Sequence, residues 1–437
     1  MPNLIQSTII LFLSNVIVRT FGFFYKIFLS RTLDASSLGI YYMIFNFLMI
    51  CIALTTTGIP TALSCLVSNR NALKDKHNSN VLFISTLYVS FFLSLFISLF
   101  VSFNSKYFAF TLLKNESLNI FILAISPAIV LITISNILRG YYYGLKDVIV
   151  PAIGQIIEQI SRILFVFLII MYLNNNYMSC YVALLGVSIG EIINIIYISS
   201  CLYKNSNLYN KYTISIKDFY YSSMETLKMS LPITCNRMSN ILLNSISSMI
   251  IPSRLALSGI TYTQSLNVYG IINGMVIPFI YLPFTLSSAL IVNLIPSISQ
   301  EVTLHNHKNI KKKISYSLIL TFIVGVFCSI FFYFFSDMIC LIMFNSKLAG
   351  IYLKSMCIVP LFLSLNHTLS AILQSIRKEV SCSIITIIGM IIQLSALYFL
   401  LPIPSINISA YMYTMTIVSI FTCLLHTAVL VKALKSF

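Results

Sequence analysis

Six ionisable side chains lie inside long apolar stretches of this 437-residue sequence. They are Arg19, Lys26, Glu158, Arg162, Glu191 and Arg237. An ionised group at the centre of a membrane-spanning helix costs roughly 2.5–3.5 kcal/mol on insertion scales, so such groups turn away from lipid towards protein or a wet cavity. These residues are therefore the first candidates for a binding or coupling site.

Arg19 and Lys26 are seven residues apart, almost two helical turns, so they share a helix face with Gly22 between them. Two cations on one face could hold a diphosphate, Arg19 through its bidentate fork and Lys26 as a point charge. The alternative, in which both side chains reach the membrane interface or pair locally, stays open.

Glu158 and Arg162 have the i,i+4 spacing that favours an intrahelical ion pair. Glu191 has no partner that its sequence neighbours reveal, so a role in ion or proton coupling is open for it. We expect these three residues to act as structural or coupling charges, and the structural role is favoured for the Glu158–Arg162 pair.

A polar stripe follows within the apolar stretch near 224–252. Its members recur at steps of three and four, and they are Ser230, Thr234, Arg237, Asn240, Asn244 and Ser248. Such a stripe in a membrane span faces a neighbouring helix or a wet cavity, and Arg237 at its centre favours the cavity. The expected substrate-binding residues are therefore Arg19, Lys26, Arg237, Asn240 and Asn244.

The elements that carry these residues must be membrane helices. The chain is 58% hydrophobic and 9% charged, whereas a soluble chain is roughly a quarter charged. Apolar runs of about 20 residues recur throughout, which predicts an all-α integral membrane protein with about twelve transmembrane helices. The predicted spans lie near 5–31, 37–67, 81–104, 118–145, 148–173, 179–203, 224–252, 265–298, 312–344, 350–376, 380–402 and 407–434.

The distribution of basic residues predicts the orientation. Seventeen of the 27 Lys and Arg residues fall at alternate junctions and the C-terminus, and six fall at the opposite junctions, which predicts that both termini are cytoplasmic in a multi-pass cell-membrane protein. The seventeen are Arg70, Lys74, Lys76, Arg139, Lys146, Lys204, Lys211, Lys217, Lys228, Lys308, Lys311, Lys312, Lys313, Arg377, Lys378, Lys432 and Lys435. The net charge of +16 is thus a topology signal, and it does not indicate nucleic-acid binding.

An internal repeat divides the chain. The segment beginning at Gly154 resembles the one beginning at Gly389, and Ser135 matches Ser370, both at an offset of 235. These matches predict two pseudo-symmetric six-helix lobes in parallel orientation, which usually enclose a midplane site. We place the N-terminal lobe at 1–203, a cytoplasmic linker at 204–223 and the C-terminal lobe at 224–437.

The sequence gives little support for metal binding, disulfide bonds or catalysis. The ten cysteines contain no C-x-x-C pair, so neither a metal site nor a disulfide framework is expected. His367 and His426 lie in late spans, where a packing role is more common than a ligand role. No catalytic residue and no cofactor is predicted.

Several motifs carry a resemblance to a known family. They include Arg19–Arg31, Leu38-Gly39-Ile40-Tyr41, Gly58-Ile59-Pro60 and Leu294-Ile295-Pro296. These motifs resemble the stage V sporulation protein B family, a branch of the multidrug/oligosaccharidyl-lipid/polysaccharide exporter superfamily. The resemblance implies a V-shaped two-lobe exporter fold that works by alternating access. Lys26 departs from the family pattern, which has Arg there. We also expect the twelfth helix to be the last, whereas many relatives have further helices after it.

Three function classes follow from this fold. The leading function class is a flippase, which moves an anionic lipid-linked oligosaccharide or peptidoglycan precursor in spore cortex or envelope polysaccharide synthesis. Such a flippase needs a cationic cavity. A cation-coupled multidrug exporter needs dominant buried carboxylates and comes second, and a membrane glycosyltransferase comes last. We expect the partners to be a lipid-linked glycan and membrane lipids, and the transporter to be monomeric. The coupling ion, Na⁺ or H⁺, is open.

Overall fold

The computed structural model describes residues 4–56, 58–73, 75–111, 115–173, 176–205, 215–284, 298, 307–376 and 378–435. Within these ranges the side chains of some helical positions, Arg237, Asn240 and Asn244 among them, lie outside the description. The described residues are helical apart from short connections and contain no strand, which confirms the all-α prediction.

Most helices begin and end within a few residues of the predicted spans. The N-terminal part contains α1 (Leu4–Thr32), α2 (Ala35–Thr56), α3 (Ile59–Ala72), α4 (Lys76–Phe103), α5 (Ser105–Thr111), a 3₁₀ turn (Glu116–Leu118), α6 (Asn119–Gly144), α7 (Ile149–Ile170) and α8 (Asn176–Asn205). The C-terminal part contains α9 (Ile216–Ala256), α10 (Tyr262–Ile271), a π-helix (Ile272–Val276), α11 (Ile277–Ile280), α13 (His307–Phe344), α14 (Lys347–Ser355), α15 (Val359–Ser375), α16 (Glu379–Leu400) and α17 (Ser409–Lys435).

Nine stretches of the described chain are long and apolar enough to cross a membrane, and ten if α14 and α15 form one span bent by 54°. Helices α1 and α9 coincide with the two remaining predicted spans, near 5–31 and 224–252, but they do not belong to that set. The chain is a multi-pass membrane protein, and the count of twelve stays a prediction.

One predicted span is interrupted. The stretch 37–67 forms two helices, α2 and α3, and Pro60 occupies the first turn of α3, where its missing N–H costs no helical hydrogen bond. Gly58 precedes this turn, and a Cβ there would overlap the Thr234 hydroxyl and the Ser230 carbonyl of α9. The break therefore coincides with a close approach between two helices that are distant in sequence.

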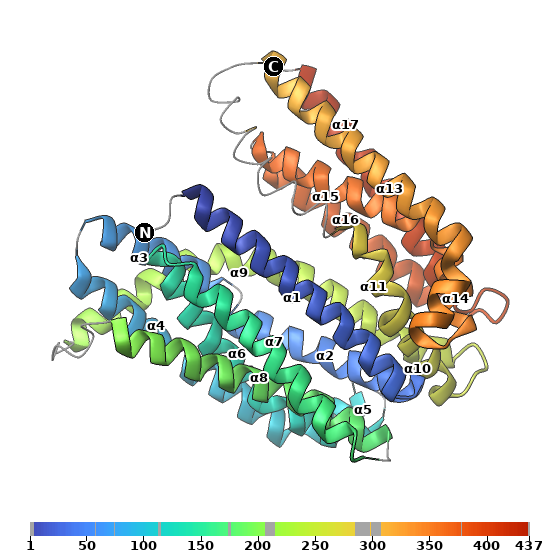
Figure 1. Ribbon diagram of the computed structural model, residues 1–437, viewed down its shortest axis with the longest axis horizontal. Helices are drawn as coiled ribbons and strands as arrows, with labels where there is room; N and C mark the ends of the chain where they lie inside the picture. The colour runs from blue at the N-terminus through green and yellow to red at the C-terminus, as the bar shows by residue number, and fades with distance from the viewer. Residues whose placement is uncertain are drawn as a thin grey trace. The chain divides into compact units, whose positions relative to one another are not determined.

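Contacts divide the chain into two compact units. The first unit contains residues 1–25 and 40–245, and Figure 1 shows its helices α4, α6, α7 and α8 running side by side. The second unit contains residues 26–39 and 246–437. The expected lobes at 1–203 and 224–437 would put 26–39 in the N-terminal lobe and 224–245 in the C-terminal lobe, the reverse of the two units. The lobe boundaries stay a prediction.

The segment 26–39 packs closely against the rest of the second unit. The Arg31 guanidinium donates hydrogen bonds to the carbonyl oxygens of Ile342 and Met343 at the end of α13. A Cβ on Gly39 would overlap the Leu266 carbonyl of α10, so only glycine permits this approach of α2. These contacts explain why the joined ends of α1 and α2 count with the second unit.

Candidate functional site

The two predicted cations on α1 have different surroundings. Arg19 is exposed and counts with the first unit, whereas Lys26 is half-buried and counts with the second. A Cβ built on Gly22, which lies between them, would meet no described atom within 4 Å. Among the described residues, none therefore covers α1 at Gly22.

The structure describes only part of the polar stripe on α9. The side chains of Arg237, Asn240 and Asn244 lie outside the described residues, so their place in a cavity stays a prediction. Ser230, at the N-terminal end of the stripe, is buried, and its carbonyl lies beside Gly58. That end of the stripe therefore packs against protein.

The first unit contains a buried ion cluster, which we define as Arg139 of α6, Glu158 and Arg162 of α7, and Glu191 of α8. Arg139 Nη2 lies 3.6 Å from Glu158 Oε2 and 3.5 Å from Glu191 Oε2. Arg162 Nη2 lies 2.6 Å from Glu158 Oε1. The four side chains are at most 13% exposed, and their two positive and two negative charges balance.

Two neutral side chains extend the ion cluster. Arg139 Nη2 donates to Ser135 Oγ at 2.7 Å, and Asn194 Nδ2 donates to the same oxygen at 2.9 Å. Asn194 Nδ2 also lies 3.5 Å from Glu191 Oε2. The cluster therefore joins α6, α7 and α8 through charge-assisted and neutral hydrogen bonds, which is what buried charges need to offset lost hydration.

Glycines permit the helix approach that encloses these charges. Gly186 and Gly190 form a G-x-x-x-G pattern on α8, a spacing that lets membrane helices pack closely. A Cβ on Gly190 would lie 2.9 Å from the Glu158 carbonyl oxygen and 3.3 Å from Arg162 Cβ. The local sequence of α8 therefore brings Glu191 beside the charged face of α7.

Two expectations from the sequence need correction. Glu191 has a partner, Arg139, which the sequence does not reveal because the two residues lie 52 positions apart on different helices. Arg139 was counted among the junction residues, but it lies inside α6 and is 13% exposed. The predicted span 118–145 includes Arg139, and this position inside an apolar span is the sequence feature that indicates a buried arginine. The expected Glu158–Arg162 ion pair is present, and its role stays a prediction.

The second unit contains a neutral counterpart, the histidine cluster of Asn366, Cys382, Thr422 and His426. Asn366 Nδ2 donates to Thr422 Oγ1 at 3.0 Å and to the Ser419 carbonyl at 2.8 Å, so its Oδ1 is left to accept from His426 Nδ1 at 3.1 Å. His426 therefore carries its proton on Nδ1, and Nε2 lies 3.8 Å from Cys382 Sγ. This buried histidine has hydrogen-bond partners, as a packing role requires.

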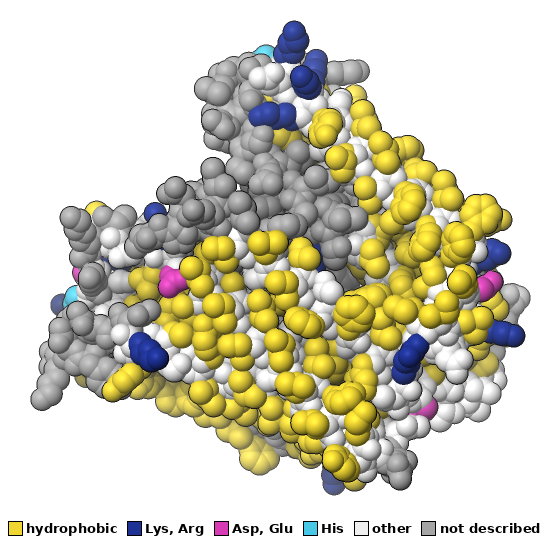
Figure 2. Space-filling model, viewed as in Figure 1, with side chains coloured by type: hydrophobic (Ala, Val, Ile, Leu, Met, Phe, Trp, Pro, Cys, Tyr) yellow, Lys and Arg dark blue, Asp and Glu magenta, His cyan; other side chains and the backbone are white. Residues whose placement is uncertain are grey.

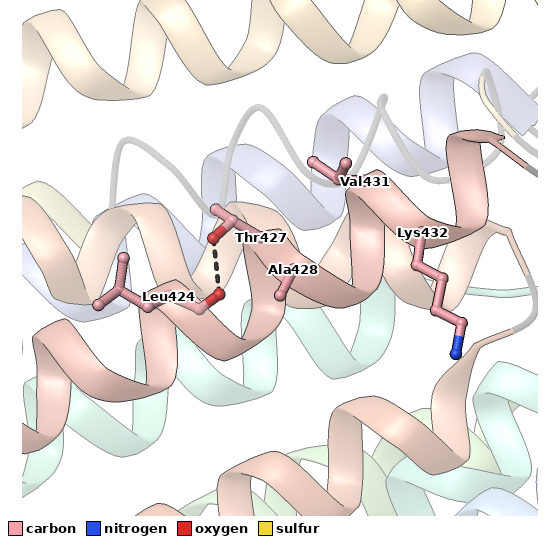
Figure 3. Close-up of a pocket in the computed structure, with 5 residues that line it drawn as sticks. All are labelled: Leu424, Thr427, Ala428, Val431 and Lys432. Carbon is pink, nitrogen blue, oxygen red and sulfur yellow. Dashed lines mark hydrogen bonds between the residues drawn. The ribbon is translucent and has the colours of Figure 1, made fainter.

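A hollow beside α17 carries little chemistry. Figure 3 shows it lined by Leu424, Thr427, Ala428, Val431 and Lys432 of that one helix. Thr427 Oγ1 donates to the Leu424 carbonyl at 2.7 Å, and Lys432 is the single charged group of this lining. Among the described residues no three His, Cys, Asp or Glu side chains are grouped as a metal site would require.

Apolar helices long enough to cross a membrane, three of which hold a balanced ion cluster, define a multi-pass membrane protein. The sequence profile of the polysaccharide biosynthesis proteins matches residues 4–300, so the chain belongs to that family. The MatE profile matches residues 238–399. The resemblance drawn from the motifs is thereby confirmed.

Individual relatives agree with this assignment. The chain is 24% identical to Stage V sporulation protein B of Bacillus subtilis over 98% of its own length and 84% of the relative's. It is also 24% identical to Lipid II flippase MurJ of the same organism, covering 90% and 76% of the two chains. A multidrug resistance MATE family transporter of the MOP superfamily, solved in an inward-facing conformation, shares the fold with a TM-score of 0.75 at 16% identity and covers 95% of both chains.

Proposed function

We propose that this protein is a flippase, which moves an anionic lipid-linked oligosaccharide or peptidoglycan precursor across the cell membrane by alternating access. The names of the relatives support a role in spore cortex or envelope polysaccharide synthesis, because one is a sporulation protein and another a lipid II flippase. In this proposal the protein acts as a transporter, and none of its residues acts as a catalyst.

One observation carries the proposal: Glu158 and Glu191, the two acids that the sequence marks as candidate coupling charges, are neutralised by arginines. Glu158 pairs with Arg139 and Arg162, and Glu191 pairs with Arg139. A carboxylate that is fixed in such a cluster would lose favourable contacts if it left to bind a cationic drug. With these carboxylates held by arginines, we propose that the cargo meets cations such as Lys26, which would favour an anionic headgroup.

A diphosphate that enters a low-dielectric cavity loses hydration, and charge-assisted hydrogen bonds must replace it. Lys26 is half-buried and lies one helical turn from Gly22 on α1, and we propose that its ammonium binds such a group. Arg19, Arg237, Asn240 and Asn244 are the further donors that we propose for the headgroup.

The second candidate is a cation-coupled multidrug exporter. The MatE match and the shared fold with a multidrug transporter favour it. The pairing of Glu158 and Glu191 argues against it, because such an exporter needs acids that can exchange a cation for a drug. Transport of a cationic dye would separate the two candidates.

The proposal can be tested by reconstituting the purified chain in liposomes with a fluorescent lipid-linked diphosphate precursor and measuring headgroup translocation. Lys26→Gln should slow translocation about 10- to 100-fold, the effect of losing one charged hydrogen bond worth about 1.5–3 kcal/mol. Lys26→Arg should retain the rate, since it keeps the charge. The matched control is Lys106→Gln on α5, an exposed lysine in a short helix, which should change nothing. Equal rates in Lys26→Gln and the parent would contradict the role of Lys26.

We also propose that both termini are cytoplasmic and that the protein works as a monomer. Single cysteines at exposed positions Asn309 of α13 and Thr263 of α10 should then react with a membrane-impermeant maleimide from opposite sides, in a background without native cysteines. Labelling of Asn309 and Thr263 from the same side would overturn the orientation. The coupling ion, Na⁺ or H⁺, is left open by this proposal.

A further inference from the structure

One end of the second unit carries a concentration of lysines. The hydrophobic cluster at this end includes Ile310 of α13, Ile376 after α15 and Leu430 of α17, so the three helix ends lie together. Exposed lysines stand two residues from each of these buried members. We name the set of Lys308, Lys311, Lys312, Lys378 and Lys432 the lysine patch, and all five side chains are exposed.

The first turns of α13 are built to present this charge. Ile310 and Ile314 are buried in the cluster, whereas Lys308, Lys311 and Lys312 have the i, i+3 and i+4 spacing of a single helix face. Figure 2 shows a group of dark blue side chains at the end of the second unit where α13 begins and α17 ends. The basic side chains are therefore held on the outer side of a packed helix end.

Neighbouring acids do not offset this charge within the described part of the chain. The described ion pairs all lie in the first unit, where Arg70 lies 3.2 Å from Glu225, for example. The side chains of Glu301 and Glu379 lie outside the description, so even both together would leave an excess of lysines. Like charges at this spacing repel one another and favour binding of an anion.

The position of the lysine patch relative to the apolar band of α13 indicates which anion it binds. Exposed large apolar side chains on α13 run from Ile319 to Ile342, which is about 36 Å of helix and close to the hydrocarbon thickness of about 30 Å. Tyr316, 70% exposed, comes just before this band, where interfacial aromatic residues lie. Lys311 and Lys312 are about 11 Å beyond Ile319, at the level of lipid phosphates.

We infer that the lysine patch is a binding surface for the headgroups of anionic phospholipids in the adjoining leaflet. This binding is separate from the transported cargo and does not depend on the proposed flippase activity. A soluble phosphate compound has the same charge chemistry but would not need the lysines to stand at the edge of an apolar band. The lipid surface is therefore the partner that the geometry favours.

The test measures lipid binding to the full chain in detergent micelles, without any precursor, by native mass spectrometry. Phosphatidylglycerol should bind more tightly than phosphatidylcholine with the same acyl chains. The variant Lys308→Gln/Lys311→Gln/Lys312→Gln should weaken phosphatidylglycerol binding at least tenfold, because each lysine near an anionic surface contributes about fivefold. Raising the ionic strength should reduce the parent's preference towards that of the variant.

The matched control is Lys204→Gln/Lys217→Gln/Lys228→Gln, which removes the same charge from exposed positions of α8 and α9. Its binding should stay within twofold of the parent. Equal losses in the two triple variants would overturn the inference in favour of a general charge effect, and an unchanged patch variant would overturn it outright. Displacement of the lipid by millimolar glycerol phosphate would also overturn it, because the site would then be one for a soluble phosphate.

Discussion

The ion cluster of the first unit and the histidine cluster of the second join corresponding helices with different chemistry. Glu191 of α8 and His426 of α17 are separated by 235 residues, the offset of the sequence repeat. Gly154 and Gly389, also 235 apart, each pack against the following helix, at Asn194 of α8 and Thr422 of α17. The packing supports the predicted repeat, while the charge differs between its two copies.

The two units offset the cost of buried polar groups in different ways. In the first unit, every charge of the ion cluster needs an opposite charge nearby, so removing one member leaves another uncompensated. In the second unit, Asn366 and His426 exchange neutral hydrogen bonds, and removing one member leaves only an unpaired dipole. The first unit should therefore be the more sensitive to substitution.

The largest effect is expected from Arg139→Met. It leaves Glu158 and Glu191 with Arg162 as their single arginine, and breaking a buried pair of this kind costs about 3–5 kcal/mol. The thermal unfolding midpoint in detergent should fall sharply. The double variant Arg139→Met/Glu191→Gln should recover part of the loss, since it restores the charge balance. A single variant that melts like the parent would contradict the charge-balance account.

The second largest effect concerns the glycines. Gly190→Ala places a Cβ against the backbone carbonyl of Glu158, which cannot move without shifting α7, so we expect a cost of about 1–3 kcal/mol. Gly389→Ala in the second unit meets the side-chain methyl of Thr422 first. Moving that methyl disturbs the hydrogen bond that Thr422 Oγ1 accepts from Asn366, a smaller cost of about 0.5–1.5 kcal/mol. Melting of both variants should show the greater loss for Gly190→Ala. The reverse order would show that the second unit is the tighter of the two.

A smaller loss is expected from His426→Leu. It removes the hydrogen bond to Asn366 Oδ1 and leaves that oxygen buried, at a cost of about 1–2 kcal/mol. A loss for His426→Leu as large as that of Arg139→Met would remove the distinction between neutral and ionic clusters.

The smallest effect is at two helix starts outside the spans. The Asn78 side chain and the Asn78 backbone N–H hydrogen-bond to Asp75 and lower the pKa of its carboxyl below the ordinary value of 3.8. A lowered carboxyl pKa stabilises the fold above that ordinary value, and the contribution is lost as the pH falls through the lowered value. Because Asp75 is solvated, the contribution is small, below about 1 kcal/mol.

The Asp75→Asn variant should therefore melt slightly below the parent at pH 7, and the difference should vanish in acid. Ser346 accepts from the Ala349 N–H at the start of α14 in the second unit, and it carries no charge. Any loss from Ser346→Ala should be independent of pH. A difference for Asp75→Asn that grows in acid would contradict the direction of the pKa change.

Much of the fold followed from the sequence because apolar length decides where membrane helices lie. The predicted span 148–173 became α7 at Ile149–Ile170, and the span 380–402 became α16 at Glu379–Leu400. The joined ends of α1 and α2 were not predicted to pack in the second unit. Such packing depends on the Gly39 approach to Leu266, a contact between helices far apart in sequence that hydropathy does not encode.

The site was predicted less completely. The Glu158–Arg162 pair is local, so its spacing revealed it. Arg139 joins α7 and α8 from a third helix, and a count of junction charges hid it because the residue lies near the end of its span. Helix periodicity places Arg237, Asn240 and Asn244 on one face of α9, and whether that face meets cargo stays a prediction.

The most direct test of the central claim compares two cargoes in the same proteoliposomes. The parent chain is reconstituted once, and translocation of a fluorescent lipid-linked diphosphate precursor and of a cationic dye is measured side by side. Neutralisation of Glu158 and Glu191 by arginines predicts that the anionic precursor crosses and that the dye does not exceed protein-free liposomes. Transport of the dye with no movement of the precursor would contradict the account and favour the drug exporter.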